Sequence, residues 1–369
     1  MQVSLTATGG LERRLEVAVP VARVNSEVSE RLKKLSRTAR LKGFRPGKVP
    51  LPVIQQQFGE QVHTEVVGDL MRSTFAEAVN LEKLTPAAGP RIEPIAVQPG
   101  TDLKYAAVFE VVPEVKLKPV AGLKVEKPVA QVTDADVEAM IESMRRQLAA
   151  QQAEHAAHCE NPEHDHGPAA AAAAPDAQLP LPALDDDFAR AFGIAEGGLE
   201  KLRTEVRASM TREVEEVVRN RLRGQVLEAL YQDNPIELPR SQVEEQVQQM
   251  QLDAGRRMGA KDVSQLPPRE PFEEPARRRV ALGYLLSELV RSEQITADRE
   301  RILARLNEMT AQYPNAEDVR RYYLQNAEAM RQVESAVLED QAVERVLAAA
   351  QITEKPTSFA ELTGFGQNK

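Results

Sequence analysis

The chain has little of what stabilises small secreted domains or one large compact core. It contains one cysteine and no tryptophan among 369 residues, and only 4% of its residues are aromatic. A single cysteine excludes an internal disulfide framework and indicates a reducing compartment. Residues 1–6 carry neither the basic nor the apolar segment of a secretory signal. No apolar run approaches the roughly 18 residues that span a bilayer, so we expect a cytoplasmic protein with no membrane partner.

Charged residues, in contrast, are abundant and unevenly distributed. They make up 28% of the chain, with a formal net charge of -9. This composition favours long, surface-rich helices, and the length leaves room for two or three domains. Within residues 31–48, however, there is no acidic residue. A concentrated basic patch on an acidic protein attracts polyanions such as RNA phosphates. The basic residues of this segment are Arg31, Lys33, Lys34, Arg37, Arg40, Lys42, Arg45 and Lys48.

The segment ends in the octapeptide 43–50, Gly-Phe-Arg-Pro-Gly-Lys-Val-Pro. Its two glycines and two prolines interrupt a helix and force a turn, which places Phe44 at an exposed tip between cations. Alternatively, the loop caps two helices and the Phe44 ring lies in their junction. A nucleotide-binding loop is excluded by spacing, because only three residues separate Gly43 from Gly47 and Val49 follows Lys48.

This octapeptide and the basic helix before it resemble the ribosome-docking signature of the trigger factor family of bacterial chaperones. The similarity continues through residues 32–38 and 68–70, and it returns at residues 192–194 and 277–286. The resemblance implies docking at the tunnel exit of the large ribosomal subunit, on ribosomal protein and rRNA. It also implies that nascent or unfolded polypeptides are sheltered without ATP. The residues that would bind the ribosome are Gly43, Phe44, Arg45, Gly47, Lys48 and Pro50, assisted by Lys33, Arg37 and Arg40.

Hydrophobic periodicity divides the chain into an α+β part and a helical part. Period-two alternation predicts a hairpin over residues 2–19 and strands at 92–97 and 103–111, while apolar spacings of three and four predict two long helices between them. We therefore predict a ribosome-binding α+β domain with a small antiparallel sheet over residues 1–113. An extended connector and helix follow over 114–150. Residues 183–369 are predicted to form an all-α chaperone domain whose long helices make arms, giving an extended multi-domain architecture.

Residues 151–182 are rich in alanine, histidine and proline and contain no aromatic residue, which is typical of a linker. In the family, a prolyl isomerase domain of the FK506-binding-protein type usually occupies this position. The resemblance therefore implies that the catalytic module is absent and that the chain is not an enzyme. Two alternatives stay open. One is a prolyl isomerase like full-length members. The other is a ribosome-independent holdase that forms a homodimer and has a metal-binding linker.

The linker concentrates the chain's metal-ligating side chains. Imidazole and thiolate groups suit zinc, nickel or copper, but this spacing matches no closed structural site. We therefore expect no resident metal and no other cofactor. The weak candidates for metal ligands are His155, His158, Cys159, His164 and His166.

A chaperone also needs apolar surface that a client can reach, and methionine suits surfaces that bind many partners. For each such residue the alternative is packing against another helix, and periodicity cannot separate a stripe that faces a helix from one that faces a client. The candidates for client binding are Met250, Met258, Met309, Tyr322, Tyr323, Leu324, Met330 and Val333.

Overall fold

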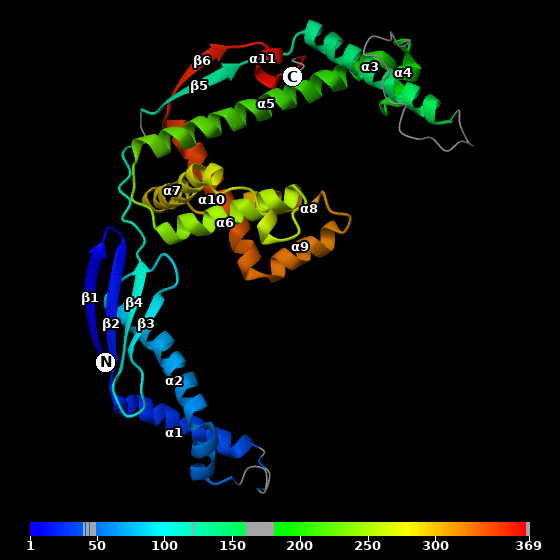
Figure 1. Cartoon of the computed structure of the whole chain (residues 1–369). Helices are drawn as coiled ribbons and strands as arrows, with labels where there is room; N and C mark the ends of the chain where they lie inside the picture. Colours follow the sequence, from blue (N-terminus) through cyan, green and yellow to red (C-terminus); the bar gives the residue numbers. More distant parts are fainter. Residues whose placement is uncertain (40, 42–43, 45–48, 120–121, 160–180, 367–369) are drawn as a thin grey trace. The chain divides into compact units, whose positions relative to one another are not determined.

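The computed structural model describes residues 1–39, 41, 44, 49–119, 122–159 and 181–366, without the side chains of 153–159 and 263. The chain forms two compact units (Figure 1). Unit 1 comprises residues 1–118 and 230–296, and unit 2 comprises 119–229 and 297–369. The units thus interleave along the sequence, whereas the division at 113, 150 and 182 assumed consecutive domains; that division stays a prediction. No helix among the described residues is long and apolar enough to cross a membrane.

Unit 1 is built on a four-stranded antiparallel sheet with the strand order β1-β2-β4-β3. The predicted hairpin and the two later strands are confirmed. Gly10, at φ +51°, supplies the left-handed turn residue of the hairpin. Alternation along β2 and β4 buries Leu15, Val17, Tyr105 and Phe109 on one face. The strands are β1 (Gln2–Gly9), β2 (Glu12–Val19), β3 (Arg91–Ala96) and β4 (Leu103–Glu110).

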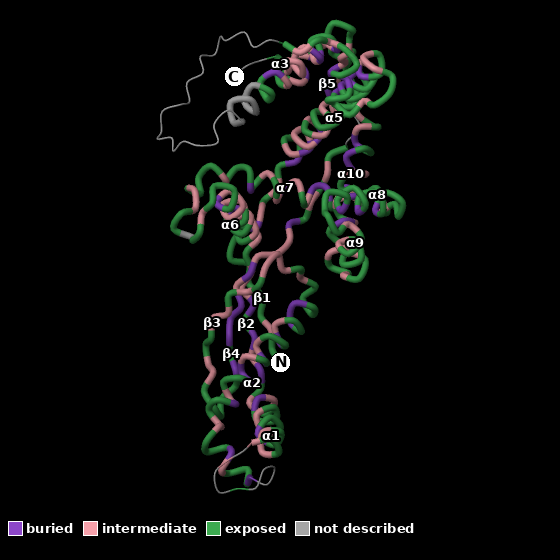
Figure 2. Tube along the Cα trace, turned by 90° about the vertical axis from the view of Figure 1, so that its right-hand side faces the viewer, coloured by how far each residue is buried: buried purple, intermediate pink, exposed green. Residues whose placement is uncertain are grey.

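Two long helices pack side by side next to this sheet in both views (Figures 1 and 2). They are α1 (Val21–Thr38) and α2 (Leu51–Leu81). Leu32 of α1 and Val66 and Leu70 of α2 belong to the same buried cluster as the inner face of the sheet. The apolar spacing of α1 therefore faces α2, as predicted, and its charged residues lie on the remaining faces.

Unit 1 also contains α6 (Arg240–Arg257) and α7 (Glu270–Ser292), which a short 3-10 helix (Val263–Gln265) separates. At the end of β4, the carboxylate of Glu110 accepts hydrogen bonds from the backbone N–H groups of Arg240 (2.9 Å) and Ser241 (2.8 Å). A carboxylate at a helix N-terminus satisfies free donors and complements the helix dipole. Glu110 thereby fixes the first turn of α6 to the sheet.

The ionisation of Glu110 reflects this contact. Burial by itself would raise the pKa of its carboxyl, but the hydrogen bonds from the Ser241 hydroxyl and the two backbone N–H groups lower the pKa below the ordinary value overall. A lowered folded-state pKa means that the contact stabilises the fold above the pKa of the unfolded chain. This stabilisation is lost as the pH falls through the folded-state pKa.

Unit 2 is mainly helical, with a core shared by helices from distant parts of the sequence. Ile141, Phe188, Met210 and Phe359 are buried in one cluster. Helix boundaries fall at Asn234-Pro235, Pro314-Asn315 and Asn326, residue types that end or cap helices. The helices are α3 (Asp134–Cys159), α4 (Asp186–Ala191), α5 (Gly198–Asp233, within this unit up to Ala229), α8 (Arg299–Thr310), α9 (Ala316–Gln325), α10 (Ala327–Ala349) and α11 (Phe359–Thr363).

Two features of unit 2 correct the sequence analysis. Helix α3 runs to Cys159, so the segment predicted as a linker from residue 151 begins as helix, in keeping with its alanine, glutamine and glutamate content. The prediction that residues 183–369 are all helical is also wrong after residue 350. There β6 (Gln351–Pro356) pairs in parallel with β5 (Lys124–Val129). All six residues of β6 are exposed, so no alternation marked this strand in the sequence.

Candidate functional site

The candidate docking site lies on α1 and on the segment that follows it. Pro20 has no side-chain cap to offer α1, and Asp102 from the loop before β4 accepts a hydrogen bond from Val21 N–H at 2.8 Å instead. Val24 and Leu32 then anchor the helix in the core. The direction of α1 is thus set by the sheet at one end and by α2 along its length.

The second half of α1 carries exposed positive charge. Lys33, Lys34 and Arg37 are exposed, and none of them forms an ion pair with any residue the structure describes. Arg31 differs, because its guanidinium pairs with Asp69 of α2 at 2.9 Å. Exposed cations without a counter-charge keep their field available to an external polyanion. Of the predicted docking cations of this helix, Lys33 and Arg37 are therefore available to such a partner, and Lys34 adds a third exposed cation.

The tip segment is described in part. Phe44 is 39% exposed and does not belong to the buried cluster of unit 1, which disfavours the alternative of a ring packed in a helix junction. Val49 is buried in that cluster, and the exposed Pro50 starts α2, its carbonyl accepting from Val53 and Ile54 N–H. The remaining predicted contact residues lie outside the described residues: Arg40, Gly43, Arg45, Gly47 and Lys48.

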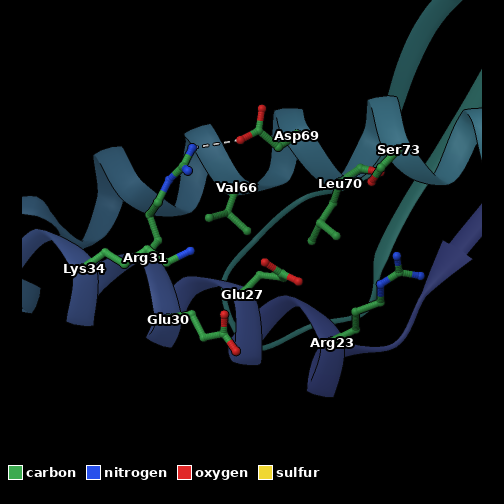
Figure 3. A pocket seen from close by; sticks show the side chains of 9 residues that line it. All are labelled: Arg23, Glu27, Glu30, Arg31, Lys34, Val66, Asp69, Leu70 and Ser73. Atoms are coloured by element: carbon green, nitrogen blue, oxygen red, sulfur yellow. Dashed lines mark hydrogen bonds and ion pairs between the residues drawn. The ribbon is translucent and has the colours of Figure 1, made fainter.

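Between α1 and α2 lie two cavities that share the lining residues Arg31 and Lys34. The one drawn in Figure 3 measures about 350 Å³ and is walled by charged groups of α1 and by Val66 and Leu70 of α2. The other, about 390 Å³, lies nearer the tip and is lined by Leu35, Phe58 and Val62 among others. Sequence reasoning missed these cavities, since they depend on how the two helices pack.

The predicted client-binding residues fall into two groups. Val333 is only 2% exposed and packs with Ile302 and Val337, while Tyr323 and Met330 pack against the same cluster. These three residues contribute to packing within unit 2. Because Val333 is buried, it is no longer a candidate for client binding. Met250 of α6 is half-buried.

The other four predicted residues are exposed. Met258, at the end of α6, is 74% exposed, and Tyr322 and Leu324 of α9 are exposed by more than half, with Met309 of α8 less so. Most of α9 is exposed in Figure 2. Leu303 of α8 and Tyr313 of the turn between α8 and α9 add to these residues, and sequence reasoning missed both. Leu303 lies off the buried stripe of Ile302 and Leu306, a signal that helical spacing already contained.

The candidate metal ligands of the linker stay a prediction. The side chains of His155, His158 and Cys159, and all of His164 and His166, lie outside the described residues. Within the part of the chain that the structure describes, no group of three histidine, cysteine or acidic residues could hold a metal ion. The available surfaces are those of a binding protein: a basic helical hairpin on unit 1 and exposed apolar residues on helices.

Comparisons with known proteins identify the family. The sequence model of the family described as bacterial trigger factor protein matches residues 1–144. The family model of the bacterial trigger factor C-terminus matches residues 198–348. Trigger factor from Thioalkalivibrio sulfidiphilus is 36% identical over 426 aligned residues, covering 98% of each chain. Trigger factor from Stutzerimonas stutzeri is 34% identical over 427, again covering 98% of each chain. The chain therefore belongs to the trigger factor family.

The fold agrees with this family. A solved structure, from work on promiscuous substrate recognition in the folding and assembly activities of the trigger factor chaperone, aligns with a TM-score of 0.59. The alignment covers 94% of this chain and 99% of the other, at 13% sequence identity. The predicted fold class, a small antiparallel sheet with long helices followed by a helical C-terminal part, is thereby confirmed.

Proposed function

We propose that this protein is a ribosome-associated chaperone that docks at the tunnel exit of the large subunit and shelters nascent polypeptides in the cytoplasm. The observation that carries the docking proposal is the exposed Phe44 on the segment that follows α1, together with the exposed cations Lys33, Lys34 and Arg37, which form no ion pair with a described residue. Aromatic and cationic groups together suit a surface of RNA phosphate and protein. Arg45 and Lys48, as family-signature residues, would extend the contact.

The second half of the proposal concerns the polypeptide. Exposed apolar residues of α8 and α9, among them Met309, Tyr322 and Leu324, offer contacts that depend on apolar burial and not on a client's sequence. Binding of this kind needs no ATP. Met258 of α6 would add a similar contact on unit 1.

Co-sedimentation with ribosomes tests the docking proposal. Replacing Phe44, Arg45 and Lys48 together by alanine is expected to weaken binding more than about tenfold, because aromatic and arginine anchors dominate such contacts. The double variant Lys33→Ala, Arg37→Ala should bind several-fold more weakly and show a flatter salt dependence, since each lost phosphate contact lowers the salt slope by about one.

The matched control is Arg91→Ala, which removes an exposed cation from β3, away from α1. Its binding should equal that of the unaltered protein. Undiminished ribosome binding by the triple variant would refute the docking proposal, whereas equal losses in all variants would show that only net charge matters.

We further propose that the chain lacks the isomerase domain and has no prolyl isomerase activity. The family models leave residues 145–197 unmatched, and the alignments with relatives span 426 positions or more, beyond the 369 residues present here. The relatives thus contain segments with no counterpart in this chain. In a proline-limited refolding assay we expect the uncatalysed rate; a clear acceleration that scales with protein concentration would contradict this proposal.

A further inference from the structure

The outer edge of β6 pairs with no described residue, and the directions of its backbone N–H and C=O groups can be assigned. Gln351 N–H donates to the carbonyl of Leu123 (2.8 Å), and Thr357 N–H donates to that of Val129 (3.0 Å). In a strand, successive residues turn their N–H and C=O groups to opposite sides. The parallel register therefore directs the backbone N–H and C=O groups of Gln351, Thr353 and Lys355 toward β5. The alternate residues of β6 direct theirs away from it.

The middle of the opposite edge of this two-stranded sheet is covered by α5. Gln225 of α5 acts as a clamp on β5: its Nε2 donates to the carbonyl of Glu126 and its Oε1 accepts from Glu126 N–H, both at 2.8 Å. Pro128 occupies the next outward-facing position and has no N–H to leave free. Figure 1 shows β5 between β6 and α5, in agreement with these bonds. The outward groups of Glu126 on β5 are thus satisfied inside unit 2.

No such clamp covers β6. The outward N–H and C=O groups of Ile352 and Glu354 form no hydrogen bond with any residue in the described ranges, and all six residues of the strand are exposed. Ile352 is 47% exposed, so an apolar side chain lies beside these free groups. Pro356, at the next outward position, has no N–H and ends the edge. Native proteins usually cover or blunt such an edge, because it is a template for pairing with another chain.

We propose that the edge of β6 at Ile352 and Glu354 binds an extended segment of an unfolded polypeptide by strand addition. The proposal rests on the chaperone function above and adds a binding mode to it. Main-chain hydrogen bonds do not depend on the client's sequence, and a third strand strengthens a two-stranded sheet. An unfolded chain fits best, because its N–H and C=O groups are free along its length, whereas a second copy would offer only the same short edge.

Amide hydrogen exchange, measured by NMR on the full chain, tests this directly. The probe is a synthetic peptide of alternating threonine and valine with two C-terminal lysines for solubility. At saturation, exchange at Ile352 and Glu354 is expected to slow about tenfold or more, as hydrogen bonding would require. Thr353 and Lys355, which already face β5, should change little. This alternation distinguishes strand addition from general shielding of the surface.

A substitution gives a second readout. Glu354→Pro removes the outward N–H but leaves the bonds to β5 intact, and prolines already stand at the equivalent outward positions 128 and 356. We expect it to weaken peptide binding about three- to tenfold, the effect of one lost hydrogen bond. Glu354→Ala is the matched control, because it keeps the N–H and should bind like the unaltered protein. Circular dichroism checks that both variants fold.

The other outcomes each overturn the proposal. Protection confined to β1 or to the helices would place the peptide elsewhere, and absence of peptide binding at millimolar concentration would remove the site. Protection of Ile352 and Glu354 without peptide, rising with protein concentration, would assign the edge to a second copy. Ribosome co-sedimentation is independent of all three results, so the proposed function can stand when the edge proposal fails.

Discussion

Replacing Phe359 by alanine is expected to lower the free energy of unfolding of unit 2 by about 3–5 kcal/mol, the usual cost of removing a fully buried aromatic side chain. Phe359 is 1% exposed, begins the short helix α11, and packs in the cluster that contains Ile141 of α3 and Met210 of α5. Its ring also lies 5.9 Å from that of Phe365. The loss would leave a cavity where three separate segments meet.

Hydrogen exchange at the amides of α3 and α5 measures this effect in unit 2 alone, which global unfolding of a two-unit chain does not. The control is Phe192→Ala, because Phe192 is 36% exposed, lies outside that buried cluster and has its ring 5.1 Å from that of Phe188. This substitution should lower the free energy of unfolding of unit 2 by about 1 kcal/mol. Equal costs for the two substitutions would show that the C-terminal helix contributes nothing to the core of unit 2.

Replacing Ile54 by alanine is expected to destabilise unit 1 by about 2–5 kcal/mol and to weaken ribosome binding as well. Ile54 is fully buried in the first turn of α2, next to Val49, at the point where the chain returns from the tip. A cavity there would loosen the junction that positions Phe44. The affinity would fall although Ile54 itself touches no partner.

Two variants make this prediction specific. Ile54→Val should cost only about 0.5–1.5 kcal/mol and retain most of the ribosome affinity. Gln55→Ala alters the exposed neighbour in the same helical turn and should change neither quantity. Exchange at α1 and α2 amides reports the stability, and co-sedimentation reports the affinity. If Ile54→Ala destabilised unit 1 but bound ribosomes normally, the tip would act independently of the helices behind it.

The elements with local signals could be predicted from the sequence. Gly9 and Gly10 lie at the turn of the predicted hairpin, and Val24, Val28 and Leu32 follow helical spacing along the inner face of α1. Asn326 is a helix boundary for a local reason, because its side chain accepts hydrogen bonds from Glu328 and Ala329 N–H at the start of α10.

Features that depend on distant parts of the chain could not be predicted. Strand β6 carries no alternation, and only its partner β5, in the other half of the sequence, makes it a strand. In α9 the neighbouring residues Tyr322 and Tyr323 looked equivalent, yet only Tyr323 packs on the cluster with Val333. Which side of an amphipathic helix is covered depends on the helices that reach it, and those are set by tertiary packing.

The pairing of β5 with β6 has a consequence for biosynthesis. Translation proceeds from the N-terminus, so residues 124–129 leave the ribosome long before their partner strand is made. The core around Ile141 likewise stays open until Phe359 has emerged. Unit 2 therefore completes its own structure only after residues 351–363 have emerged, and until then a newly made copy is itself an incomplete chain exposing apolar surface.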